Sequence, residues 1–234
     1  MADLENAVEL FNKGNAAGML NDFAEAYDCF SKAAELGYAP AQCNLGFCYE
    51  KGHGVPHNYS KAVEYYRNAA EQGYAPAQCN LGWCYESGYG VEQDLSKAVQ
   101  YYLLSAKQGH APAQGNLGFC YGNGNGVPKN LDKAYEWFNN AAAQGNVFSQ
   151  FNIGECYESG KGVVQNIEKA IEWYRKSAEH GYAPAQFHLG LCYENGNGVT
   201  KNALKAHEWF NHAAIQGHPA AQQHIDNLKK RELI

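Results

Sequence analysis

The feature that most constrains this chain is a unit that repeats every 36 residues. Each copy closes at a glycine, after which the same pattern starts again; these glycines are Gly37, Gly73, Gly109, Gly145, Gly181 and Gly217. A fixed period of this size indicates a solenoid, in which each unit buries its apolar face against its neighbours. Function is then expected at positions that vary between copies, not in a single catalytic signature.

Each copy predicts a pair of helices. In the copy from Ala39 to Gly73, Pro40 suits a first helical turn because its missing N–H is not needed there. The glycine-rich segment 52–57 breaks this first helix, and Asn58 is an N-cap for a second helix that ends at Gly73. The chain shows no strand periodicity, so we predict an all-α fold of roughly thirteen helices.

The period divides the chain into one solenoid domain with two atypical ends. Five full units are expected at residues 39–73, 74–109, 110–145, 146–181 and 182–217. Residues 1–38 are expected to form an N-terminal capping repeat, with a short first helix near 4–13 and a long loop over 14–21. Residues 218–234 are expected to form a C-terminal capping helix, since the segment becomes polar toward its end.

Charge and hydropathy exclude several classes of function. Eighteen Lys and Arg against 24 Asp and Glu give a net charge of -6, which provides no basic surface for nucleic acid. The sequence has no apolar run long enough to span a membrane, and residues 1–5 lack the pattern of a signal peptide. We therefore expect a soluble cytoplasmic protein without membrane insertion, although a leader already removed would leave the same sequence.

The eight cysteines are expected to be free thiols. Five of them share one repeat position, and equivalent atoms of neighbouring helix pairs lie roughly 10 Å apart; these are Cys48, Cys84, Cys120, Cys156 and Cys192. A disulfide needs Cα atoms within about 7 Å, so this row cannot pair with itself. Free thiols indicate a reducing compartment.

The repeat resembles the Sel1-like repeat (SLR) family, a relative of the tetratricopeptide (TPR) repeats. The matching pattern recurs in all five copies, except that the fourth has Ser149 and Ile153 in place of the alanine and the leucine; its residues in one unit are Ala41, Gln42, Leu45, Gly46, Tyr49, Gly52, Gly54 and Val55. The resemblance implies a right-handed superhelical α/α solenoid of antiparallel helix pairs, whose first helices line a concave surface. It also implies a protein–protein interaction scaffold or adaptor.

The variable positions of the first helices are the candidate partner-binding surface. Positions 43 and 47 are expected to point away from the core, where large apolar side chains need a reason; the candidates are Cys43, Phe47, Cys79, Trp83, Phe119, Phe151, Glu155, Phe187 and Leu191, with Gly115 at position 43 of the third unit. The alternative is that they pack against the neighbouring unit.

Position 44 offers side chains that both donate and accept hydrogen bonds; these are Asn44, Asn80, Asn116, Asn152 and, in the last unit, His188. They could clamp the backbone of a bound peptide, a role that the resemblance to TPR proteins also implies. Hydrogen bonding between adjacent units is the alternative.

Two charged rows run along the repeats. The acidic row on the first helices comprises Glu50, Glu86, Glu158 and Glu194 and is interrupted by Gly122. The basic row on the second helices comprises Lys61, Lys97, Lys133, Lys169 and Lys205. They represent either solvated charge with weak local pairing or, for the acidic row, a surface that selects a basic peptide.

The sequence predicts no metal site, cofactor, small-molecule substrate or catalytic residue. The nine histidines lack zinc-site spacing, and the loop 122–126 lacks the Gly-Lys-Ser/Thr ending of a phosphate loop. No nucleophile has a neighbouring base. We therefore expect a non-enzymatic scaffold that binds a protein or peptide segment.

Two other functions stay open at this point. The chain could be a structural subunit that uses its convex face or forms oligomers through its terminal caps, although a monomer is expected. It could also have the lactam-binding or cell-wall-related activity attributed to some relatives that it resembles.

Overall fold

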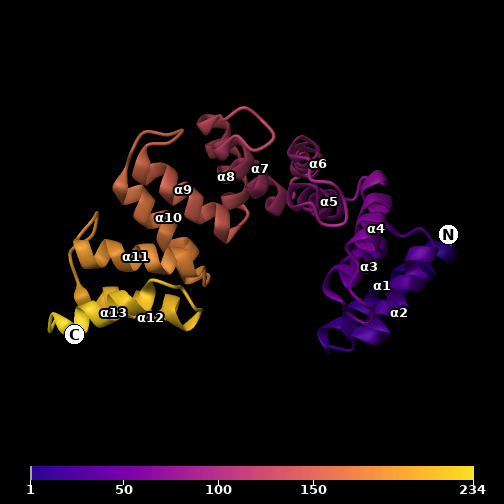
Figure 1. Cartoon of the computed structure of the whole chain (residues 1–234), viewed down its shortest axis with the longest axis horizontal. Helices are drawn as coiled ribbons and strands as arrows, with labels where there is room; N and C mark the ends of the chain where they lie inside the picture. The colour runs from indigo at the N-terminus through magenta and orange to yellow at the C-terminus, as the bar shows by residue number, and fades with distance from the viewer. Residues whose placement is uncertain (1) are drawn as a thin grey trace. The chain divides into compact units, whose positions relative to one another are not determined.

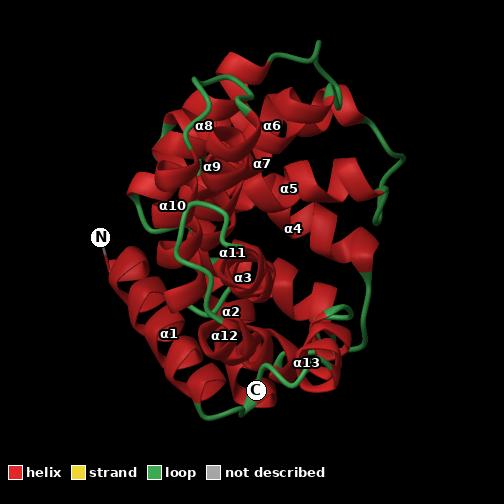
Figure 2. Ribbon diagram, turned by 90° about the vertical axis from the view of Figure 1, so that its left-hand side faces the viewer, coloured by secondary structure: helices red, strands yellow, loops and turns green. Residues whose placement is uncertain are grey.

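The structure, a computed structural model, describes residues 2–234. Within these residues the chain forms thirteen helices, which confirms the predicted helical solenoid (Figure 1). Figure 2 shows only helices and loops in the same range. The helices are α1 (Ala2–Met19), α2 (Phe23–Glu35), α3 (Ala39–Lys51), α4 (Tyr59–Glu71), α5 (Ala75–Ser87), α6 (Leu95–Lys107), α7 (Ala111–Asn123), α8 (Leu131–Ala143), α9 (Val147–Ser159), α10 (Ile167–Glu179), α11 (Ala183–Asn195), α12 (Ala203–Ile215) and α13 (Ala221–Lys230).

Local sequence determines where the helices begin and end. The Asn58 side chain accepts a hydrogen bond of 3.0 Å from the amide of Lys61 and so caps α4. The same cap precedes four later second helices, as predicted; its residues are Asp94, Asn130, Asn166 and Asn202. The helix α3 ends at Gly52, whose φ of 75° lies in the left-handed region that favours glycine.

The N-terminal pair differs from the sequence-based expectation. Helix α1 continues to Met19, and only residues 20–22 connect it to α2. The predicted long loop at residues 14–21 is therefore wrong. Gly14 lies within α1 and against the Phe30 ring, where a Cβ would come within 2.7 Å of a ring carbon.

The first and second helices of a unit pack at a glycine. A Cβ at Gly46 would lie 2.8 Å from the ring of Tyr66, which is fully buried in α4. The loop glycine Gly54 has φ 71°, and a Cβ there would overlap the carbonyl oxygen of Phe23 in the preceding second helix. These two contacts explain why both glycines recur in every copy.

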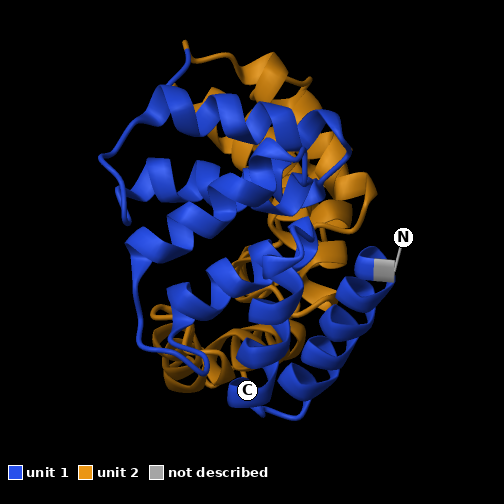
Figure 3. Cartoon of the chain, turned by 90° about the vertical axis from the view of Figure 1, so that its right-hand side faces the viewer, with its two compact units in different colours: residues 1–113, 125–127 blue, residues 114–124, 128–234 orange. Residues whose placement is uncertain are grey.

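The chain forms two compact units (Figure 3). The first comprises residues 1–113 and 125–127 and contains α1 to α6; the second comprises residues 114–124 and 128–234 and contains α8 to α13. Most of α7 belongs to the second unit. Each unit has its own buried apolar residues, including Tyr66 in the first and Tyr174 in the second.

Candidate partner-binding surface

Position 43 of the first helices lies largely in the core. Cys43, Cys79 and Phe151 are only 5%, 6% and 8% exposed. The Cys43 sulfur accepts a hydrogen bond from Asn80 of the next helix pair at 3.7 Å. The expectation that these three side chains point away from the core is therefore wrong, since a first helix is covered both by its own second helix and by the next pair.

The later members of this position are covered by neighbouring residues. Phe187 is half-buried, and its ring stacks on His218 with the centroids 4.2 Å apart. Gly115 is buried, and a Cβ built on it would lie 2.8 Å from the Ser149 hydroxyl oxygen. Packing against the neighbouring pair, the alternative that the sequence left open, therefore describes position 43.

The acidic row bonds within the fold. Glu50 is 8% exposed, and its carboxylate accepts a hydrogen bond of 2.7 Å from the Tyr66 hydroxyl. The same pair recurs twice, with Tyr102 donating to Glu86 at 2.6 Å and Tyr174 donating to Glu158 at 2.7 Å. The first and second helices of three units are thus joined by a Glu–Tyr pair, which directs these carboxylates toward the second helix of their own unit.

The last acidic residue has a different set of contacts. Glu194 lies 2.8 Å from His224 and 3.4 Å from Arg231, both from the C-terminal helix and its end. Phe210 stands in this unit where three other units have the donating tyrosine. The C-terminal segment therefore supplies the donors that the second helix lacks.

The lysines of the basic row lie over tyrosine rings. The ammonium of Lys61 is 5.1 Å from the centroid of the Tyr49 ring. Four later copies repeat this contact at 5.3–5.4 Å; they are Lys97–Tyr85, Lys133–Tyr121, Lys169–Tyr157 and Lys205–Tyr193. Cation–π contact accounts for the recurrence of lysine at this position.

The asparagine row makes hydrogen bonds inside the protein. Asn44 donates to the side-chain oxygen of Asn15 at 3.0 Å, and Asn152 donates to the carbonyl of Phe148 at 2.7 Å. Together with the Asn80–Cys43 bond, the Asn44 bond joins adjacent helix pairs. The His188 ring contacts that of Phe151, with the centroids 5.1 Å apart. These contacts favour bonding between repeats over backbone clamping for Asn44 and Asn80.

Position 47 holds the accessible apolar side chains. Phe47 and Phe119 are 43% and 42% exposed, which is unusual for phenylalanine in a chain whose other rings are mostly packed. Trp83 and Leu191 are half-buried, and Glu155 is exposed. Of the predicted surface, this row remains available to a partner.

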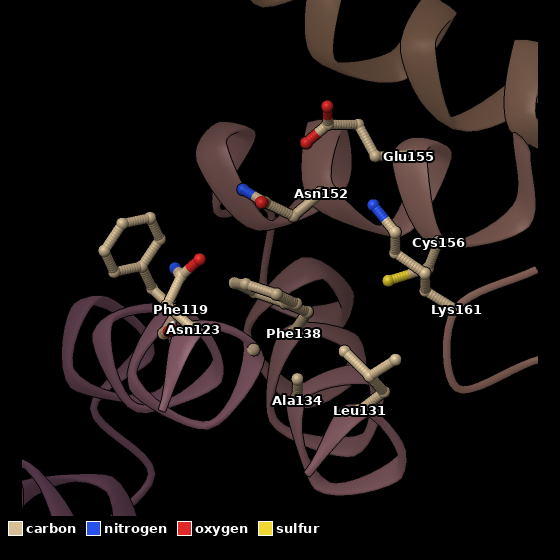
Figure 4. A pocket seen from close by; sticks show the side chains of 10 residues that line it. Phe119, Asn123, Leu131, Ala134, Phe138, Asn152, Glu155, Cys156 and Lys161 are labelled. Atoms are coloured by element: carbon tan, nitrogen blue, oxygen red, sulfur yellow. Dashed lines mark hydrogen bonds between the residues drawn. The ribbon is translucent and has the colours of Figure 1, made fainter. Parts of the chain in front are cut away.

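A pocket opens in the second compact unit, at a repeat that lacks the Glu–Tyr pair. Gly122 and Phe138 stand where other repeats have glutamate and tyrosine. The resulting space, about 190 Å³ and here named the Gly122 pocket, is lined by Gly122, Phe119, Leu131, Phe138, Asn152, Glu155, Cys156 and Lys161, among others. Figure 4 shows the Lys161 ammonium directed toward the space between Asn152 and Glu155.

A second pocket, the Gly18 pocket, lies in the first compact unit. It has a volume of about 450 Å³ and is lined mainly by apolar residues, including Met19, Phe23, Phe30 and Phe47. Gly18 and Phe30 here replace the glutamate and tyrosine. Gly122 interrupts the acidic row of the sequence, but neither pocket was predicted; the loss of the tyrosine 16 residues after Gly122 is the signal that could have found the Gly122 pocket.

The surroundings of the Gly122 pocket perturb one acid. Desolvation raises the pKa of Glu155, Lys161 counters the shift and Glu158 adds to it. Burial also raises the pKa of the Cys156 thiol, to about 11. The pocket therefore combines an aromatic and aliphatic wall with one cationic and one acidic group.

The described part of the chain holds neither a cluster of possible metal ligands nor a helix that could span a membrane. Over residues 2–234, no three His, Cys, Asp or Glu side chains gather closely enough to hold a metal ion. No helix within that range is both long and apolar enough to cross a membrane.

Comparison with known proteins identifies the repeat. The sequence matches the Sel1 repeat at residues 7–38, 39–74, 75–110, 111–146, 147–182 and 183–218, so that the region expected to be a cap contains the first of six matches. Among curated proteins, none matches this sequence.

Two solved structures are similar over nearly the whole chain. A Sel1 repeat protein from Oxalobacter formigenes has 32% identity and a TM-score of 0.85, covering 95% of this chain and 87% of its own. A protective antigen of uropathogenic Escherichia coli with an SLR fold has 38% identity and a TM-score of 0.83. That match covers 97% of this chain but 50% of the antigen, so the chain spans half the length of this relative.

Proposed function

Because the chain belongs to the Sel1 repeat family, we propose that it is a non-enzymatic scaffold that binds a protein or peptide segment through position 47 of its first helices. Sel1 repeats generally mediate protein–protein interactions.

One observation carries the proposal: Phe47 and Phe119 are large, apolar and more than 40% exposed at the same position of two repeats. Exposed aromatic side chains are enriched at protein interfaces and dominate their binding energy. Trp83 adds a third ring at this position, in the first compact unit. The other rows bond inside the fold, which leaves position 47 as the variable row with free surface.

Affinity capture from an extract of the native cell tests the proposal. We expect Phe119→Ala and Phe47→Ala each to reduce recovery of the bound partner several-fold, because truncated interface anchors cost about 2 kcal/mol or more. Leu204→Ala is the matched control, since Leu204 is 68% exposed but lies on the second helix α12. Recovery equal to that of the parent protein with both Phe47→Ala and Phe119→Ala would overturn the proposal, and so would a larger loss with Leu204→Ala than with either variant.

A further inference from the structure

The two pockets occupy the same place in the repeat. Each of the ten residues that line the Gly122 pocket has an equivalent among the ten that line the Gly18 pocket. The offset is 108 residues, or three periods, for the second helices and the first helices that follow them. It is 104 for α1 against α7, because the α1–α2 connection is four residues shorter.

This correspondence shows that the pockets are a consequence of one paired replacement. Where glutamate and tyrosine are present, as in Glu158 and Tyr174, a carboxylate and a hydroxyl meet between the helices. Where glycine and phenylalanine replace them, both polar groups are absent and the space is left open beside an aromatic ring. Both changes are found together at both pockets, so the local packing survives while a side-chain-sized space is created.

The Gly122 pocket has the size and lining for an aromatic ring. Its volume of about 190 Å³ exceeds the roughly 150 Å³ of an engineered apolar cavity that binds benzene. Leu131, Ala134 and Phe138 give it an apolar side (Figure 4). The Gly18 pocket, by contrast, has Phe47 and His53 where the Gly122 pocket has Glu155 and Lys161.

The polar side of the Gly122 pocket selects the substituent on that ring. Lys161 is a donor and Glu155 is, when ionised, an acceptor. They act on each other electrostatically without forming a salt bridge, so neither group is neutralised by direct contact with the other. A phenol hydroxyl is both a donor and an acceptor and can satisfy the two groups together.

We propose that the Gly122 pocket receives a tyrosine side chain of the partner segment, with its ring against Phe138 and Leu131 and its hydroxyl between Glu155 and Lys161. The inference rests on the proposed scaffold function and specifies one residue of the partner. A cationic side chain fits less well because Lys161 repels it, and a carboxylate fits less well because of Glu155.

The probe is p-cresol, the side-chain analogue of tyrosine, titrated into the full chain and followed by NMR. We expect shifts of resonances from α7, α8 and α9, and binding roughly tenfold weaker for toluene, which lacks the hydroxyl that bonds charged groups. Equal affinity for p-cresol and toluene, or p-cresol binding elsewhere only, overturns the proposal.

Two double variants test whether p-cresol binds in the Gly122 pocket and whether Glu155 and Lys161 recognise its hydroxyl. The double variant Gly122→Glu with Phe138→Tyr restores the pair found in three other repeats, so it is expected to fold and to lose p-cresol binding. Glu155→Gln with Lys161→Met is expected to leave toluene binding unchanged and to remove the preference for p-cresol. Retained p-cresol binding in the first variant, or retained preference in the second, overturns the assignment.

Affinity capture separates failure of this inference from failure of the scaffold function. A protein that captures its partner through Phe47 and Phe119 but binds p-cresol no better than toluene refutes only the tyrosine pocket. A protein whose capture is indifferent to Phe47 and Phe119 refutes the proposed function, whatever the result with p-cresol.

Discussion

The Tyr66 hydroxyl donates a 2.7 Å hydrogen bond to the carboxylate of Glu50, and this contact ties α4 to α3 inside the core. Tyr66 is fully buried, and burial together with Glu50 raises its pKa, so the phenol stays protonated and remains a donor. Where the pair is absent in α7 and α8, a pocket replaces it.

Removing the Tyr66 hydroxyl, which donates this hydrogen bond, should destabilise the first compact unit. In Tyr66→Phe, Glu50 loses its Tyr66 donor while 8% exposed, and we expect unfolding free energy to fall by about 1.5–3 kcal/mol, the range for a hydrogen bond to a charged group. Urea unfolding measures this loss. In Tyr66→Phe with Glu50→Gly, the combination found at Phe138 and Gly122, we expect part of the loss to be recovered; a single variant as stable as the parent protein would contradict the account.

His180 should lower the stability of the protein, and replacing it with glutamine should raise the stability. In four other units a glutamine at the end of the second helix bonds to a glutamine of the first helix; an example is Gln144, which donates to Gln114 at 2.7 Å. His180 replaces that donor, and the buried Oε1 of Gln150 finds no hydrogen-bond donor among residues 2–234. We expect His180→Gln to stabilise the protein by about 1 kcal/mol, since it restores one hydrogen bond.

Thermal unfolding of His180→Gln and His180→Ala distinguishes this cause from a change of helix propensity. The glutamine variant should have the higher Tm of the two. A larger gain in the alanine variant would show that the Gln150 carbonyl oxygen is not the reason.

Two buried serines should respond in opposite directions to alanine. The Ser149 hydroxyl is buried without a hydrogen-bond partner in the described chain, whereas Ser177 donates to the carbonyl of Val147 at 2.7 Å. We expect Ser149→Ala to stabilise and Ser177→Ala to destabilise, each by about 1 kcal/mol. Denaturant midpoints of the two variants provide the comparison, and a shift of the same sign in both would refute this explanation.

Glu155, the acidic residue of the Gly122 pocket, should make the stability of the folded protein depend on pH. The pKa of Glu155 is raised above its usual 4.5 by desolvation, so the folded state binds the proton more tightly than the unfolded state. Its contribution to stability is fully present below the unfolded pKa and is lost as pH rises through the raised folded value. Because the Glu155 side chain is exposed, solvent weakens this effect, and comparing the parent protein with Glu155→Gln from pH 4 upward should show a small loss specific to the parent.

The neighbouring lysine offers a second test of the same acid. Lys161 lowers the Glu155 pKa, so Lys161→Met should raise it further. An NMR titration of the Glu155 carboxyl group measures the change directly, and a pKa that falls in this variant would contradict the arrangement of the two groups.

The sequence predicted the repeat fold because its signals are local. Pro40, Asn58 and Gly52 act within a turn or two of their own positions, and all three begin or end a helix as expected. The burial of Cys43 was not predictable in the same way, because it depends on how one helix pair packs against the next. A helical wheel drawn for a single unit places Cys43 outside.

The pockets were hidden for two different reasons. Gly122 and Phe138 are both visible in the sequence, but their link appears only when Tyr66 is found bonded to Glu50 in the structure. Gly18 was obscured further, because the short α1–α2 connection shifts α1 by four residues against the 36-residue period. The exposure of Phe47 and Phe119 agrees with the helical-wheel prediction, but variation between copies does not distinguish position 47 from the buried position 43.

Photo-crosslinking from Phe119 tests the central claim most directly. A benzophenone side chain is placed at position 119 of α7 in one sample and at position 204 of α12 in another, and each is irradiated in native cell extract. The account predicts a discrete crosslinked partner from position 119 and none from position 204. A partner captured from position 204 and not from position 119 would contradict it.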